Sequence, residues 1–109
     1  RKGKFNQQQI LPSGLVEEII SGGSREAFKG SVYGQSLKNW SYQDMWWNTH
    51  NEHGAFAARG VHGQTIYIDP KAEMVLVRFA SHPEAKNSKI DPTSLPAYHA
   101  VAKYLLSKN

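Results

Sequence analysis

The sequence predicts an α+β fold in which helices pack on an antiparallel sheet. Residues 65–68 and 74–79 are rich in β-branched and aromatic side chains, and the residues between them, 69–73, have the composition of a tight turn. Together these segments predict a β-hairpin. Residues 15–20 and 94–106 instead carry apolar side chains at helical spacing. Because the helical segments flank the strands rather than alternate with them, the order is typical of the α+β class.

The first third of the chain predicts one helix and a long loop. The apolar face of the helix comprises Leu15, Val16, Ile19 and Ile20. Gly22-Gly23 ends it. Residues 24–40 contain scattered glycines and serines, which indicates a surface loop with a helical turn around Glu26. Residues 1–9 are polar and show no helix or strand pattern. Since the sequence opens with Arg1, we expect one unit, residues 1–109, that is a fragment of a larger protein.

The remainder predicts three consecutive antiparallel strands and a second helix. Residues 42–48 are aromatic and β-prone, residues 50–54 resemble a turn, and residues 55–59 form a short run of small side chains before the hairpin. Residues 81–92 indicate a polar loop. The apolar stripe of the helix over 94–106 comprises Tyr98, Val101, Ala102 and Leu105, and Pro96 fits its first turn. Both helices are thus available to cover one face of the sheet.

Composition excludes several classes of function. The net charge is +4 from 13 basic and 9 acidic residues, but the basic residues are scattered, which indicates a solvated surface rather than a nucleic-acid track. No apolar run is long enough to span a membrane, and no apolar segment follows the basic first residues as in a signal peptide. The chain has no cysteine, which excludes disulfides and thiolate metal sites but leaves cytoplasm and periplasm equally open.

The chain carries no recognisable nucleophile of its own. An activated serine needs a base at a fixed offset, yet none of the ten serines has lysine three positions later, and no Gly-x-Ser-x-Gly motif occurs. A zinc site built from His50, Glu52 and His53 with His62 and His82 is conceivable. However, His-x-x-His on a turn is a weak signal, so we expect no metal and no cofactor.

Two features suggest a binding surface. Trp46 and Trp47 must point to opposite faces of a strand, so one fills the core while the other lies under a helix or lines a groove. Residues 54–64 are dense in glycine and alanine, which lets another backbone approach closely, whether a helix or a substrate. A tightly packed edge strand with a bulge explains the same pattern.

These residues resemble part of a known enzyme family. The matching segments are Trp46-Trp47, residues 50–56, Gly60-Val61-His62-Gly63-Gln64, residues 67–70 and residues 80–83. They are similar to the C-terminal segment of the serine β-lactamases and penicillin-binding proteins, and most similar to the esterase-like branch with the 6-aminohexanoate-dimer (nylon-oligomer) hydrolases. The resemblance covers essentially the whole chain and implies the C-terminal part of a β-lactamase/transpeptidase-like fold.

The resemblance also implies a division of labour within the site. A Ser-x-x-Lys nucleophile and a Tyr-x-Asn-type base would lie outside this chain, upstream of Arg1, so the chain alone would be inactive. This chain would supply the strand that carries Lys-Thr-Gly in β-lactamases, which is absent here. The equivalent is either Ala58-Arg59-Gly60 followed by Val61, or His62-Gly63-Gln64. We favour the first, because related amide hydrolases use the N–H after that glycine in the oxyanion hole.

The expected function is therefore ester or amide hydrolysis by a serine hydrolase through an acyl-enzyme. Val61 N–H is the expected oxyanion donor, and the expected substrate-binding residues are Arg59, Gly60, His62, Trp47 and Asn48. Without Lys-Thr-Gly, β-lactam turnover is in doubt. The expected partners are a small ester or amide and, through the open sheet edge, the N-terminal remainder of the protein or a second copy. The alternative is a non-catalytic binding module with the same fold.

Overall fold

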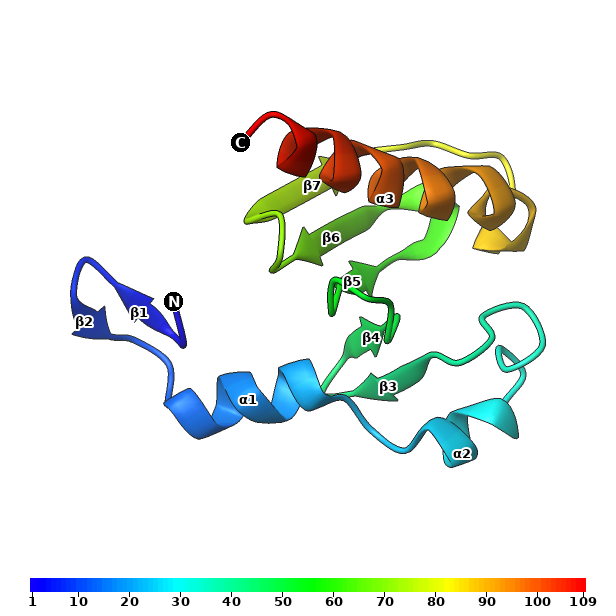
Figure 1. Cartoon of the computed structure of the whole chain (residues 1–109). Helices are drawn as coiled ribbons and strands as arrows, with labels where there is room; N and C mark the ends of the chain where they lie inside the picture. The colour runs from blue at the N-terminus through cyan, green and yellow to red at the C-terminus, as the bar shows by residue number, and fades with distance from the viewer.

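A five-stranded antiparallel sheet runs through the centre of the structure, with helices against it (Figure 1). The computed structural model describes residues 1–109. The elements in chain order are β1 (Lys4–Phe5), β2 (Gln8–Gln9), α1 (Ser13–Ser21), α2 (Arg25–Lys29), β3 (Ser41–Gln43), β4 (Trp46–Asn48), β5 (Phe56–Arg59), η1 (Val61–Gly63), β6 (Thr65–Asp69), β7 (Met74–Arg78), η2 (Asn87–Lys89) and α3 (Asp91–Ser107). The predicted α+β class is confirmed.

The sheet contains more strands than the sequence predicted. Its order is β3-β4-β5-β6-β7, so each strand pairs with the next one along the chain. The predicted single segment 42–48 is instead two strands, joined by the two-residue turn Asp44-Met45, and Gln43 pairs with Trp46. Both turn residues have positive φ, 51° and 69°. Such a turn is normally recognised by an Asn-Gly or Asp-Gly pair. Because Asp44-Met45 lacks the glycine, the sequence did not predict this turn.

A second small hairpin was missed for the same reason. The polar residues that were expected to lack structure form β1 and β2, with Lys4 opposite Gln9. Asn6 and Gln7 connect them, with φ angles of 46° and 65°. The two strands are exposed and have no apolar pattern, so hydrophobic periodicity could not reveal them.

The helices follow the prediction more closely. α1 ends at Gly22, as expected, and α2 is the helical turn predicted around Glu26, with Ser24 Oγ accepting a hydrogen bond from Ala27 N. α3 begins at Asp91, three residues earlier than predicted. Pro92 occupies the first turn, where a missing N–H costs nothing. Pro96 therefore lies inside the helix rather than in its first turn, which corrects the prediction.

The sheet has two different faces. Directly paired residues share a face, and on one face Tyr67 packs against Tyr98 of α3 with ring centroids 5.5 Å apart. The core on this face comprises Ala55, Ala57, Tyr67, Met74, Tyr98 and Ala102. A smaller core of Phe28, Leu37 and Trp40 lies beside α2 and contacts Trp47. The two cores together form one continuous covered face.

α1 does not join α3 on that face, so the expectation that both predicted helices cover one side of the sheet was wrong. Asn48 Nδ2 donates to Ile19 O of α1 at 3.0 Å, and Asn48 pairs with Ser41 and Phe56, on the side opposite Trp47. Further along this opposite face, Ile66, Val75 and Val77 remain 40%, 63% and 54% exposed. Apolar surface is therefore left uncovered here. None of the helices combines the length and the hydropathy of a membrane span.

Candidate functional site

The connection between β5 and β6 is the centre of the candidate site. Gly60 is extended, Val61 begins the short η1 helix, and His62 takes a left-handed conformation with φ 58°. Gly63 follows with φ 89°, and a Cβ there would lie 3.2 Å from Ala80 Cβ. A glycine is therefore required at this position both by the backbone conformation and by the close packing.

The loop that follows β7 holds this turn in place. Asn87 Nδ2 donates to Gly60 O, and Gly63 N donates to Asn87 Oδ1, both at 2.9 Å. His62 N donates to Ala85 O at 3.1 Å, and His62 Nδ1 lies 2.7 Å from His82 O. These bonds offset the cost of about 1–2 kcal/mol for a left-handed residue with a side chain. The turn is thus fixed by contacts from far along the chain.

Val61 has the one backbone N–H in this turn without a partner. The N–H groups of Gly60, His62 and Gln64 donate to backbone carbonyls, and that of Gly63 donates to Asn87. The Val61 N–H makes no hydrogen bond, and the residue is 61% exposed. Backbone donors are rarely left unpaired unless water or a ligand reaches them. Val61 therefore presents a fixed and accessible hydrogen-bond donor.

A cavity of about 500 Å³ adjoins this donor. Its lining residues are Val32, Tyr33, Gln35, Ser36, Trp47, Arg59, Gly60, Val61, Ala85, Lys86, Asn87, Ser88 and Asp91. They come from the loop before β3, from β4 and β5, and from the loop that clamps the turn. Four residues that the sequence predicted for the site, Trp47, Arg59, Gly60 and Val61, thus meet at one cavity.

Arg59 lines this cavity, and its side chain is held in place by several contacts. Its Nη2 lies 2.5 Å from Asp91 Oδ1, with the two side chains only 7% and 14% exposed. The guanidinium also lies over Trp47 and Trp40, 5.4 and 5.6 Å from the ring centroids. Because Asp91 already balances its charge, Arg59 is better suited to position the two indole rings than to bind a substrate carboxylate.

Two predicted site residues have other roles in the structure. Asn48 is 2% exposed, and its amide is committed to α1, so it does not line the cavity. The His62 ring points to the clamping loop, where its Nδ1 meets His82 O. Trp46 packs against Phe56, with ring centroids 5.2 Å apart. As predicted, it faces the side of the sheet opposite Trp47.

Sequence reasoning missed the residues that hold the site together. Asn87 and Asp91 lie in the predicted polar loop 81–92 with no motif around them, and Trp40, at the end of the predicted loop 24–40, was interpreted as a core residue. Asn87 acts on a turn 24–27 residues earlier in the chain. Only a map of long-range contacts could have found it. Asp91 carried a weak signal, because an acidic residue followed by proline is typical of a helix start.

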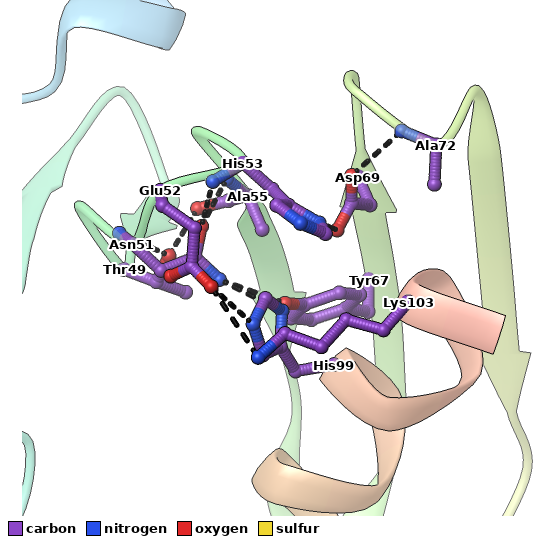
Figure 2. Close-up of polar contacts among 10 residues, drawn as sticks. All are labelled: Thr49, Asn51, Glu52, His53, Ala55, Tyr67, Asp69, Ala72, His99 and Lys103. Atoms are coloured by element: carbon purple, nitrogen blue, oxygen red, sulfur yellow. Dashed lines mark hydrogen bonds and ion pairs between the residues drawn. The ribbon is translucent and has the colours of Figure 1, made fainter. Parts of the chain in front are cut away.

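A second polar cluster lies where the turn 49–54 meets α3 (Figure 2). His53 Nδ1 and Asp69 Oδ2 are 2.7 Å apart, with side chains 4% and 0% exposed. Asn51 Oδ1 accepts hydrogen bonds from His53 N and Ala55 N at 3.1 and 3.0 Å, which fixes the turn. Across from it, Glu52 Oε1 lies 3.0 Å from His99 Nε2. The turn is therefore bonded both to β6 and to α3.

The electrostatics of this cluster shift two pKa values. A hydrogen bond from its own backbone and one from His99 lower the pKa of Glu52 to about 2. Burial raises the pKa of Tyr67 to about 12, and its hydroxyl accepts a hydrogen bond from Asn51 Nδ2 at 3.4 Å. Glu52 is therefore a carboxylate and Tyr67 a neutral phenol at physiological pH.

The four histidines considered for a zinc site, His50, His53, His62 and His82, do not converge. His50 Nε2 lies 2.6 Å from Ser41 Oγ, and burial, followed by the charge of Arg25, lowers the pKa of His50. His62 and His82 meet each other at the β5–β6 turn. The residue that joins Glu52 and His53 is His99, whose ring lies 4.5 Å from that of His53. His99 follows Tyr98 in the predicted second helix, and no metal-ligand spacing in the sequence links it to Glu52 and His53.

The fold of this chain is similar to part of a solved structure. A solved structure from Bacillus anthracis, provisionally named a 6-aminohexanoate-dimer hydrolase, superposes with a TM-score of 0.73 at 37% identity, covering 97% of this chain and 26% of that one. No family model matches the chain.

A curated relative carries the same name. The 6-aminohexanoate-dimer hydrolase of Paenarthrobacter ureafaciens is 36% identical over 76 residues, which is 70% of this chain and 19% of that protein. The chain is thus similar to a part of the 6-aminohexanoate-dimer hydrolases, as its motifs predicted. It spans about a fifth of the curated relative's length.

Proposed function

We propose that this chain is the C-terminal portion of a serine hydrolase of β-lactamase-like fold, which cleaves a linear ester or amide through an acyl-enzyme. The observation that carries the proposal is the unpaired Val61 N–H at the edge of the cavity, on a turn clamped by Asn87. A donor that is already fixed needs no reorganisation when charge develops on a substrate oxygen. The similarity to named hydrolases over almost the whole chain supports the same reading.

In this proposal, the rest of the protein supplies the nucleophile and base. A serine Oγ attacks the substrate carbonyl carbon while its proton passes to the base. The negative charge that forms on the carbonyl oxygen is stabilised by Val61 N–H together with the serine's own N–H. The alcohol or amine leaves with a proton from the base, and water then hydrolyses the acyl-enzyme. Gly60 lets the substrate approach the strand closely, and Trp47 with Arg59 forms the wall of the pocket.

The substrate class follows from the pocket and from the relatives. The lining combines aromatic and small polar side chains in about 500 Å³, which suits a slender flexible chain. The relatives are named for a dimer of 6-aminohexanoate, a linear amide. We therefore propose a linear amide or ester of an ω-amino acid as substrate. The strand has no Lys-Thr-Gly to hold a β-lactam carboxylate, so β-lactams should be poor substrates.

The partner of this chain is the remaining part of the same protein. β7 is the outermost strand of the sheet, and its outer edge is free (Figure 1). Beside it lies the exposed apolar face of Ile66, Val75 and Val77. A free edge next to uncovered apolar side chains favours pairing with another segment. A second copy of this chain is the other occupant that we expected from the sequence.

Reconstitution tests the proposal. The N-terminal part is expressed separately and mixed with this chain, and turnover of a p-nitrophenyl ester and of the 6-aminohexanoate dimer is compared with that of the intact protein. We expect turnover from the mixture and from the intact protein, and none from either part alone. Labelling by a fluorophosphonate probe should require the N-terminal part. An intact protein that binds the amide but neither turns it over nor takes the label would favour the binding module instead.

A further inference from the structure

We propose that Glu52, His53 and His99 form a zinc site that links the turn 49–54 to α3. One ligand atom from each of the three residues lies within 4.8 Å of the others. Figure 2 shows Glu52 from the turn meeting His99 from the helix, with the His53 ring nearby and turned toward Asp69. Two imidazole nitrogens and one carboxylate oxygen are a donor set that zinc accepts, with a fourth position left for water. This inference is independent of the hydrolase proposal.

His53 is oriented as a metal ligand would be. Its Nδ1 lies 2.7 Å from Asp69 Oδ2, and Asp69 is fully buried. The other carboxylate oxygen of Asp69 accepts a hydrogen bond from Ala72 N at 2.9 Å. A carboxylate that accepts Nδ1–H leaves Nε2 of the same ring with a free lone pair. It also fixes the orientation of the ring, which is the usual support behind a zinc-bound histidine.

His99 and Glu52 face each other across the proposed metal position. His99 Nε2 and Glu52 Oε1 are 3.0 Å apart. A tetrahedral zinc with ligand bonds of about 2.0–2.1 Å needs ligand atoms about 3.3 Å apart, so a small outward movement of Glu52 would bring this pair to the required distance. Glu52 is 59% exposed, so its side chain can rotate to complete the site.

The metal would replace the hydrogen bond between His99 and Glu52, and two weaker contacts also oppose metal binding. Lys103 Nζ lies 3.5 Å from Glu52 Oε1, but its side chain is 60% exposed and can turn into solvent. Asn51 Nδ2 lies 3.4 Å from His99 Nδ1, and binding at Nε2 would move the ring proton to Nδ1 and break this long contact. Against these losses, Glu52 and the nearby Asp69 provide two negative charges for one divalent cation. The balance favours binding of a borderline metal such as zinc over magnesium or calcium, which prefer all-oxygen sites.

The test is zinc titration of the intact, tag-free protein by isothermal calorimetry. We expect saturable binding of one equivalent of Zn²⁺, no competition by tenfold excess Mg²⁺, and the visible absorption of tetrahedral cobalt when Co²⁺ replaces zinc. Zinc should also raise the melting temperature, because it binds only the folded arrangement of the turn and α3.

Matched variants locate the site. His99→Gln and Glu52→Gln, both at accessible positions, should each weaken zinc binding at least tenfold. The control His82→Gln, which removes a histidine outside the cluster, should leave the affinity unchanged. Circular dichroism checks that each variant folds. The proposal is overturned if the intact protein binds no zinc, or if His99→Gln binds it as tightly as the parent.

Discussion

At the scale of single residues, burial changes what two polar side chains can do. Tyr67 is 2% exposed, and burial raises its pKa to about 12. Its phenol thus serves as a neutral hydrogen-bond partner for Asn51 rather than as a base. Asn87 is only half-buried, yet its amide makes two hydrogen bonds to the β5–β6 turn. Each of these side chains owes its role to contacts remote in sequence.

Tyr67 predicts a loss of stability at alkaline pH. A phenol whose pKa is about 10 in the unfolded chain and about 12 in the folded one stabilises the fold fully below pH 10. This contribution falls as the pH rises from 10 to 12, because the unfolded state ionises first. Chemical denaturation at several pH values measures this loss of unfolding free energy. In Tyr67→Phe, the part of the fall between pH 10 and 12 that is due to Tyr67 should disappear. An unchanged slope in Tyr67→Phe would contradict the assignment.

Asn87→Ala tests the clamp on the turn. The substitution removes both hydrogen bonds, and we expect the free energy of unfolding to fall by about 1–3 kcal/mol. For the hydrolysis proposed above, kcat of the intact protein should fall more than KM rises, because the freed turn no longer holds Val61 in place. Ser81→Ala, at an exposed position of the same loop outside the cavity lining, is the matched control. Equal effects of the two substitutions would argue against a clamp.

At the scale of elements, the structure differs from the sequence prediction mainly at turns. The helices α1 and α3 and the hairpin β6–β7 were predictable because their apolar residues repeat at regular spacing. The β3–β4 hairpin was not, because its turn residues Asp44 and Met45 take left-handed conformations without a glycine. The family resemblance pointed to Trp47, Gly60 and Val61, and the fold brings these three residues to one cavity. Asn87 and His99 were not predicted, since only the tertiary fold brings them to their partners.

The Asp44-Met45 turn predicts a stabilising substitution. Met45 is 78% exposed and has φ 69°, so it contributes little packing and bears the cost of a left-handed backbone. Met45→Gly removes a cost of about 1–2 kcal/mol but adds the conformational entropy of glycine. We expect a net gain of about 0.5–1 kcal/mol in the free energy of unfolding, measured by thermal denaturation. Met45→Ala, which keeps the strain, should give no such gain.

At the scale of the whole molecule, the uncovered apolar face is the dominant feature. Only 16 of the 109 residues are buried, and the face opposite α3 leaves Ile66, Val75 and Val77 in contact with solvent. A chain with this surface should self-associate when it is produced alone. The unpaired edge of β7 is where we expect the strand of a second copy to pair.

Introducing positive charge on this apolar surface is the corresponding test. Val75→Lys combined with Val77→Lys should convert the isolated chain from an associated form to a monomer, measured by analytical ultracentrifugation. The same pair should prevent reconstitution with the N-terminal part, because charges would be buried there. Lys71→Glu, a charge change in the turn before β7, is the control. Association that is unaffected by the double substitution would place the interface elsewhere.

Val61→Pro tests most directly whether, in the proposed hydrolase, Val61 donates its N–H to the developing oxyanion. Proline removes only this N–H, and the extended Gly60 before it, with φ −108° and ψ 175°, tolerates a following proline. Val61→Ala keeps the N–H and is the control. In the intact protein we predict that Val61→Pro lowers kcat for the ester by about 10²–10³-fold, while Val61→Ala stays within a few-fold of the parent. Equal activity of the proline and alanine variants would contradict the account.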